Sequence, residues 1–304
     1  MRIRIADTVS LATDTLAANR FRSALTMLGV TIGVASVILL TSIGDGVKKF
    51  VTDQFTALGT NVLICTPGRT ETTGGPPLIA DTTEGITLAD AAAVRDRATE
   101  LSFVAPVSFG TANVKFGNRN RSILVIGTVA EFEIIRHMHV EVGSFLPHSQ
   151  DVSEKQVVVL GRKIKDELFP GENPLGKRIL VDDRRFRVVG VMQKKGRSLG
   201  FDLDDLIFVP IAAAQEIFNH DRVQEMLATA PTEAGLDRGK EQVRAILMAR
   251  HDGKEDFTIH DQDDMLSILT TIMSVLTYAL AGIAGISLVV GGIGIMNIML
   301  VSVT

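Results

Sequence analysis

The chain has 304 residues, of which 46% are apolar and 22% charged, with 31 basic and 35 acidic side chains and a net charge of −4. This slightly acidic balance excludes a protein that binds nucleic acid through a broad basic surface. The single cysteine, Cys65, excludes an intrachain disulfide, so burial of apolar side chains must stabilise the fold.

Residues 23–44 are uncharged and apolar, which predicts a first transmembrane helix, because roughly 20 helical residues cross the hydrocarbon core. Residues 1–22 are expected to stay in the cytoplasm, since short basic flanks remain on that side of the membrane. The basic residues of this flank are Arg2, Arg4, Arg20 and Arg22. A cleaved signal peptide fits less well, because its apolar core spans only about 7–15 residues. The middle of the chain is therefore expected to be extracytoplasmic.

A stalk helix is predicted over residues 45–60, because apolar side chains continue to recur there every three or four positions. These side chains are Val47, Phe50, Val51, Phe55 and Leu58. Gly59 is expected to cap the helix, and Gly44 and Gly46 at the predicted membrane exit are candidate hinge residues.

Residues 61–108 and 215–260 are each predicted to hold a β-α-β unit. In the first, strands over 61–65 and 101–108 flank a helix that opens with a capping box from Thr87 to Asp90. In the second, strands over 223–229 and 257–260 flank a helix over 232–250. Together they predict one split α+β lobe.

Residues 109–214 are predicted to form an inserted, mainly β lobe with largely antiparallel strands and one helix near 163–168. Its expected strands cover residues 112–116, 122–127, 157–160, 178–181, 186–192 and 206–209. Residues 67–85, rich in Thr, Gly and Pro, are expected to form a mobile loop.

A second long helix is expected to begin after Asp261, a good N-cap residue, and to run through the uncharged residues 266–304. We divide it into a stalk over 261–275, a second transmembrane helix over 276–300 and a terminal segment over 301–304. The predicted fold class is thus an α+β membrane protein, in which two transmembrane helices with stalk extensions flank a two-lobed extracytoplasmic domain.

Small residues at helix-packing spacing occur in both predicted membrane segments, where they allow close contact between helices. The candidate packing residues are Gly29 with Gly33, Ala281 with Gly285, and Ser287 with Gly291.

Two motif-like features point to chemistry only weakly. Residues 171–177 fit the first seven positions of a phosphate-binding loop, but Arg178 replaces the magnesium-binding hydroxyl and a strand follows, which favours a turn. His137 and His139 are the best candidate metal ligands, although scattered surface histidines are commoner. No catalytic residues and no cofactor site are predicted in this chain.

Several segments resemble the MacB/FtsX-type permeases of ABC transporters. Near the ends these are residues 21–38 (FRSALTMLGVTIGVASVI), the pair Gly44 and Gly46, and residues 291–304 (GGIGIMNIMLVSVT). Within the middle region, GSFL at 143–146, VVVLG at 157–161, LFPG at 168–171, NPLGKR at 173–178, FRVVGV at 186–191 and DDLIFVP at 204–210 resemble the MacB-like periplasmic core domain.

The resemblance implies a multi-pass permease of the bacterial inner membrane that transmits ATP-driven motion to an extracytoplasmic domain in order to export a substrate. An ABC ATPase on a partner chain would bind ATP and magnesium, and the permease would form a homodimer or a permease heterodimer within the lipid bilayer. A periplasmic adaptor and an outer-membrane channel remain open. Family members usually have four spans, so we expect that the chain is truncated after the second.

Two other classes stay open from the sequence. A two-span membrane sensor with an extracytoplasmic ligand-binding domain has the same topology. A membrane-anchored metalloenzyme would depend on His137 and His139.

Overall fold

The computed structural model describes residues 20–57, 61–68, 85–148, 156–198 and 201–303. The chain divides into two compact units, one made of residues 1–51 and 266–304 and the other of residues 52–265. The expected mobile loop and the expected cap Gly59 fall largely on residues 69–84 and 58–60, outside the described residues.

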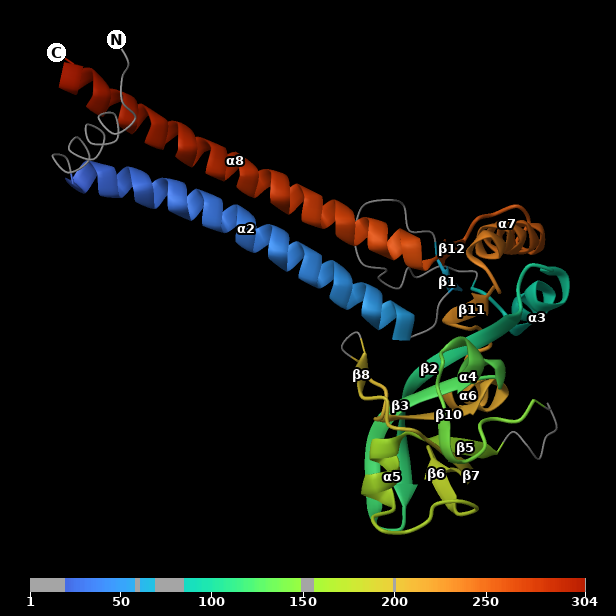
Figure 1. The fold of residues 1–304 in the computed structure, drawn as a ribbon. Helices are drawn as coiled ribbons and strands as arrows, with labels where there is room; N and C mark the ends of the chain where they lie inside the picture. Colours follow the sequence, from blue (N-terminus) through green and yellow to red (C-terminus); the bar gives the residue numbers. More distant parts are fainter. Residues whose placement is uncertain (1–19, 58–60, 69–84, 149–155, 199–200, 304) are drawn as a thin grey trace. The chain divides into compact units, whose positions relative to one another are not determined.

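The first unit consists of most of two long helices, α2 (Arg20–Ala57, 38 residues) and α8 (Gln262–Val303, 42 residues). They lie side by side in opposite directions (Figure 1). A Cβ atom placed on Gly44 of α2 would lie 3.9 Å from the sulfur of Met273 of α8. The helix α2 runs unbroken through the candidate hinge residues Gly44 and Gly46, as the sequence pattern predicts for one continuous helix.

Large apolar side chains are exposed along both helices. On α2 they include Met27, Leu28, Ile32, Val34, Ile38, Leu39 and Ile43, and on α8 Ile272, Val275, Leu276, Ile283, Ile286, Val289, Val290, Ile293 and Met296. Among the described residues, however, no helix is long and apolar enough to qualify as a membrane span. The transmembrane assignments of residues 23–44 and 276–300 are therefore not confirmed by the structure.

The second unit is built on one ten-stranded mixed sheet with the order β12-β1-β11-β2-β3-β10-β5-β7-β4, in which β6 pairs with β2 and β7. The strands are β1 (Val62–Pro67), β2 (Phe103–Phe116), β3 (Arg119–Thr128), β4 (Val140–Gly143), β5 (Val157–Leu160), β6 (Arg178–Val181), β7 (Arg184–Met192), β10 (Leu206–Pro210), β11 (Glu225–Thr229) and β12 (Phe257–His260). A separate hairpin joins β8 (Arg197–Ser198) to β9 (Phe201–Asp202).

Four of these strands form the split β-α-β arrangement. β1 lies between β12 and β11 and is antiparallel to both, and β11 in turn is antiparallel to β2. The helices α3 (Leu88–Arg97) and α7 (Glu233–Arg250) make the two crossovers. Thr87 and Asp90 form the predicted capping box of α3, and Thr232 caps α7 by accepting a hydrogen bond from the Gly235 N–H. The α+β class is confirmed.

The strand β2 is long enough to change partners along its length. Its residues 103–107 pair with β11, while residues 108–116 pair with β3. The division into lobes at residues 108 and 214 stays a prediction, because residues 52–265 form one compact unit.

The rest of the sheet carries three helices, α4 (Glu131–Ile135), α5 (Arg162–Leu168) and α6 (Ile211–Phe218). Two of its strand pairs are parallel, β3 with β10 and β5 with β7, which the expectation of largely antiparallel strands did not include. A parallel pair needs a long crossover, and residues 161–183, with α5 and β6, supply one between β5 and β7.

Three clusters of buried side chains stabilise this unit. One includes Leu63 and Cys65 with residues of α3 and α7, and a second surrounds Ile164 and Phe169 between the sheet and its helices. The third contains Val62 and Leu227 together with Phe208, and so joins strands from both predicted lobes. Neighbouring residues of β1 enter different clusters because successive side chains of a strand point to opposite faces of the sheet.

Candidate functional site

The two strands that lead to the long helices are hydrogen-bonded neighbours. β1 follows α2 along the chain and β12 precedes α8, and Ile64 of β1 is opposite His260 of β12. Because the pair is antiparallel, the start of β1 and the end of β12 lie at the same end of the sheet. The chain therefore enters and leaves the sheet at one place.

The first turn of α8 is fixed by a reciprocal cap. Asp261 Oδ1 accepts a hydrogen bond from the Asp264 N–H at 2.7 Å, and Asp264 Oδ2 accepts one from the Asp261 N–H at 3.3 Å. The predicted N-cap role of Asp261 is confirmed. Carboxylates at this position also favour the helix because its N-terminus carries a partial positive charge.

Lys240 of α7 binds both carboxylates of that cap. Its Nζ lies 2.6 Å from Asp261 Oδ2 and 2.8 Å from Asp264 Oδ2. Burial opposes the charged form of the lysine, yet the two carboxylates raise the pKa of Lys240. Burial likewise opposes ionisation of Asp261, but the lysine lowers its pKa. Lys240 thus joins α7, which packs on the sheet, to the beginning of α8.

A second polar network lies where α3, α7 and the segment before β12 meet. Asp90 of α3 accepts a hydrogen bond from Arg250 Nε at 2.5 Å, and its other oxygen lies 3.3 Å from His251 Nε2. His251 Nδ1 lies 2.5 Å from Asp256 Oδ1. Asp90 and His251 are almost completely buried, so the network is part of the core.

Charges in this network shift each other's ionisation. Burial would raise the pKa of Asp90, but hydrogen bonds from Thr87 and Arg250 lower it to about 2. Burial would lower the pKa of His251, but the carboxylates of Asp256 and Asp90 raise it. Burial, together with these two negative charges, raises the pKa of the Cys65 thiol, so the cysteine stays protonated and is a poor nucleophile.

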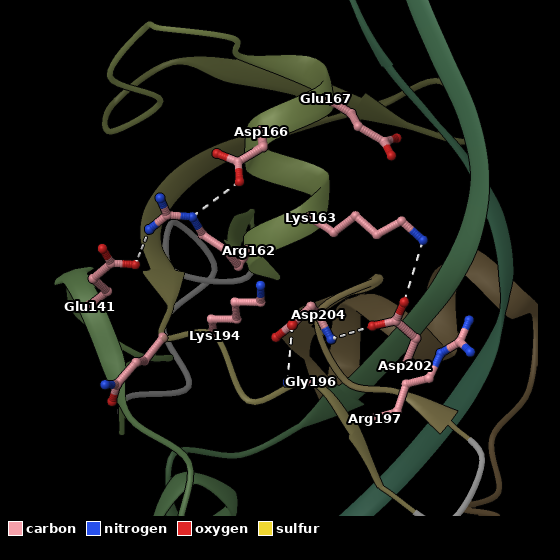
Figure 2. A pocket seen from close by; sticks show the side chains of 11 residues that line it. Glu141, Arg162, Lys163, Asp166, Glu167, Lys194, Gly196, Arg197, Asp202 and Asp204 are labelled. Atoms are coloured by element: carbon pink, nitrogen blue, oxygen red, sulfur yellow. Dashed lines mark hydrogen bonds and ion pairs between the residues drawn. The ribbon is translucent and has the colours of Figure 1, made fainter.

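One cleft of this unit has a volume of ≈ 830 Å³ and is strongly charged (Figure 2). It is lined by Glu141, Arg162, Lys163, Asp166, Glu167, Gln193, Lys194, Gly196, Arg197, Asp202 and Asp204. The guanidinium of Arg162 on α5 bonds to the carboxylate of Glu141 on β4, and Arg162 Nε lies 3.2 Å from Asp166 Oδ2. Lys163 Nζ lies 2.5 Å from Asp205 Oδ2 and 3.4 Å from Asp202 Oδ2.

The buried Asp204 organises the wall of this cleft. Its two oxygens accept hydrogen bonds from the Lys195 N–H at 2.8 Å and the Gly196 N–H at 3.0 Å. Lys195 Nζ in turn donates to the Arg136 carbonyl at 2.7 Å, at the end of α4. The lining includes no Ser, His or Cys. Most of the charges bond to one another, which holds α5, β4 and β9 together.

The candidate metal ligands are not part of a larger ligand set. His137, in a left-handed conformation with φ of 47°, and His139 are both exposed after α4. Within the described ranges, no group of three or more His, Cys, Asp or Glu side chains is placed to hold a metal ion.

Residues 171–177 form the predicted turn. Gly171 and Gly176 have positive φ, the Asn173 side chain accepts a hydrogen bond from the Leu175 N–H, and β6 follows directly. Lys177 bonds to Glu172, and its Nζ lies 5.6 Å from the ring centroids of Phe116 and Phe169. The lysine that resembles a nucleotide-binding residue is therefore engaged in local packing.

The candidate helix-packing residues are only partly placed. Gly33 is buried, whereas Ala281 and Gly285 are exposed, and among the described residues no atom beyond the adjacent helix backbone lies within 4 Å of a Cβ placed on Gly285. The roles of Gly29, Ser287 and Gly291 also stay predictions.

Residues 23–246 match the family model of the MacB-like periplasmic core domain. The chain belongs to this family. Among curated MacB relatives, the macrolide export ATP-binding/permease protein MacB of Marinobacter nauticus is 37% identical over 295 residues, which cover 96% of this chain and 45% of the relative. The pyoverdine export ATP-binding/permease protein PvdT of Pseudomonas putida is 36% identical over 289 residues, covering 94% of this chain and 43% of the relative. The chain thus spans less than half the length of these relatives.

Solved structures show the same fold as this MacB-like chain. The periplasmic region of MacB from Actinobacillus actinomycetemcomitans aligns with a TM-score of 0.60 at 21% identity, covering 73% of this chain and 97% of that structure. The extracellular domain of the ABC-type transporter YknZ from Gram-positive bacteria aligns with a TM-score of 0.55 at 13% identity, covering 66% of this chain and all of that domain.

Proposed function

We propose that this chain is the permease component of an ABC-type export system. The observation that carries the proposal is identity of 36–37% to proteins named as ATP-binding/permease export proteins, over nearly the whole of this chain. In this proposal its role is mechanical, and an ABC ATPase on a partner chain binds ATP and magnesium and hydrolyses the ATP.

In this proposal α2 and α8 carry residues 23–44 and 276–300 through the bacterial inner membrane, and residues 45–265 are extracytoplasmic. Lipid would cover the apolar side chains that α2 and α8 expose. Both segments are free of charged residues, which would be costly in the hydrocarbon core.

Motion would reach the extracytoplasmic domain through the paired strands β1 and β12. The Lys240 contact with Asp261 and Asp264 supports this route, because it ties α7 to the first turn of α8. The chain would act as a homodimer or together with a second permease, and transmission of ATP-driven motion to the extracytoplasmic domain requires no catalytic residue here. A periplasmic adaptor and an outer-membrane channel would complete the export path.

Reporter fusions test the topology. Alkaline phosphatase fused after residue 110 should be active, because that enzyme matures only outside the cytoplasm, and a cytoplasmic reporter fused there should be inactive. The opposite pair of results would place the sheet inside the cell and contradict the proposal.

Purification from native membranes tests the export assignment. The tagged full-length protein should bring down an ABC ATPase, and deletion of its gene should reduce efflux of at least one compound from a panel. A chain that instead co-purifies with a kinase or cyclase would support the two-span sensor.

A further inference from the structure

We propose that His251 is a proton-dependent contact in the core. When both ring nitrogens are protonated, His251 joins α3, α7 and the segment before β12. When only one is protonated, that junction loosens. This inference rests on the contacts within residues 52–265, and it holds whether or not the chain works in export. It adds a regulatory device to the site described above.

The geometry requires a doubly protonated ring. His251 Nδ1 lies 2.5 Å from Asp256 Oδ1 and Nε2 lies 3.3 Å from Asp90 Oδ2, so a carboxylate oxygen faces each ring nitrogen. An ionised carboxylate only accepts hydrogen bonds, and a neutral imidazole has only one N–H to donate. A neutral His251 would therefore point a lone pair at one of the two carboxylates, which is repulsive.

Asp90 does not depend on the histidine alone. Arg250 Nε donates to its Oδ1 at 2.5 Å, while the Thr87 N–H and hydroxyl donate to its Oδ2 at 2.8 and 2.7 Å. The charge of Asp90 is thus compensated by Arg250 in either state of the imidazole.

Asp256 is in a different position. Its Oδ1 contacts His251, and its Oδ2 is buried without a hydrogen-bond partner among the described residues. The side chain is 15% exposed and that of His251 is 9% exposed, so water can replace the lost contact only if the segment moves. The Cys65 thiol on β1, another titratable group near these carboxylates, is neutral and supplies no positive charge.

Asp256 also fixes the start of β12. Its carbonyl accepts a hydrogen bond from the Gly68 N–H at 2.7 Å, and the Thr258 hydroxyl donates to the Gly68 carbonyl at 2.6 Å. The next residue, Phe257, packs edge-on against the His251 ring with centroids 6.1 Å apart. Loss of the imidazolium charge should therefore weaken the contacts that hold the turn between α7 and β12, a few residues before α8 begins.

The direction of the pH dependence follows from the raised pKa of His251, in which hydrogen bonds to Asp256 and Asp90 outweigh the effect of burial. The contribution of the protonated His251 contacts to stability is complete below the ordinary pKa of histidine, about 6.5. It is lost as the pH rises through the higher pKa of the folded chain.

Mass spectrometry on the full chain in lipid nanodiscs tests both parts of the proposal. Exchange of the imidazole C2 hydrogen reports the pKa of each histidine, and the pKa of His251 should lie above the ordinary histidine value of about 6.5. Backbone amide exchange, corrected for the intrinsic effect of pH, should show that residues 251–260 lose protection as the pH rises and His251 gives up one ring proton. Asp256→Asn should lower the pKa of His251, because it removes the nearer negative charge.

His251→Gln should abolish the pH-dependent loss of protection in residues 251–260, and the control His220→Gln should leave it unchanged. A His251 pKa at or below the ordinary histidine value of about 6.5 in the wild-type protein would overturn the proposal, and so would unchanged pH dependence in His251→Gln. If His251→Gln does not fold, the wild-type and Asp256→Asn titrations still decide. None of these measurements involves transport, so their failure would leave the export assignment untouched.

Discussion

Lys240 Nζ lies 2.6 Å from Asp261 Oδ2, so a helix that packs on the sheet is bonded to the residue that starts α8. Both side chains are largely buried, and the lysine also contacts Asp264, which makes this contact more than an exposed surface ion pair. Removal of the Lys240 contact should therefore affect both the stability of the sheet unit and any coupling through α8.

We expect Lys240→Gln to lower the free energy of unfolding by about 1–2 kcal/mol, because it removes the positive charge that contacts the Asp261 and Asp264 carboxylates. Thermal or denaturant unfolding of the purified chain measures this. Lys115→Gln is the control, since Lys115 lies 3.8 Å from an almost fully exposed Asp183 and should change stability little. In the reconstituted transporter, Lys240→Gln should reduce export while ATP hydrolysis continues; export at the wild-type level would argue against coupling through this contact.

Asp90→Asn should make the protein less sensitive to acid. The pKa of Asp90 is lowered to about 2 in the folded chain, so its contribution to stability is present above the unfolded pKa of about 3.9 and is lost as the pH falls through 2. At neutral pH, the free energy of unfolding of the variant should be about 2 kcal/mol lower than that of the wild type. The variant should also show a shallower loss of stability between these pH values. The exposed Asp96→Asn is the matched control, and equal acid profiles for both variants would contradict the role given to Asp90.

Val51→Pro should separate ATP hydrolysis from export. Proline inside a helix removes a backbone hydrogen bond and costs about 3 kcal/mol or more, so α2 should kink between Gly46 and its end at Ala57. The variant must first be shown to insert and to bind its ATPase. Export that persists unchanged would show that α2 does not act as a rigid lever.

Lys177→Ala should leave nucleotide hydrolysis by the complex within about twofold, a difference of roughly 0.4 kcal/mol in the activation barrier. The lysine packs near Phe116 and Phe169 in a turn that precedes a strand, so its loss should cost only about 0.5–1 kcal/mol of stability. Equilibrium binding of labelled ATP to the isolated chain provides the direct measurement. Micromolar binding that disappears in Lys177→Ala would refute the turn assignment.

Local patterns predicted the elements whose signals are strong. The capping box at Thr87 and Asp90, the cap at Asp261 and the helix after Thr232 all have side-chain chemistry that acts within one turn. Strands β5, β6 and β12 lie at the predicted residues because β-branched and apolar residues are concentrated there. The helix α4 was missed because it has only five residues and its N-cap Ala130 makes no side-chain bond.

Pairing between strands was harder to predict. The parallel pairing of β5 with β7 and of β10 with β3 did have a sequence signal, since β5 (VVVL) and the first four residues of β10 (LIFV) are unbroken apolar runs, which are typical of parallel strands. The helix α6, which was not predicted, also had a sequence signal, because Ala212 to Ala214 are three consecutive residues of high helix propensity. The contacts of Lys240 with Asp261 and of His251 with Asp90 join residues distant in sequence, and no local pattern specifies them.

The position of β1 between β11 and β12 also bears on the biogenesis of the protein. Both partners of β1 lie close to the other end of the sheet unit in sequence, and Ile64 pairs with His260 only after about 200 further residues have been synthesised. Such distant pairing is slow, and an unpaired apolar strand is prone to aggregate while it waits. The nascent chain should therefore need protection from the time β1 emerges until β12 has been made, and chaperone depletion should expose that interval.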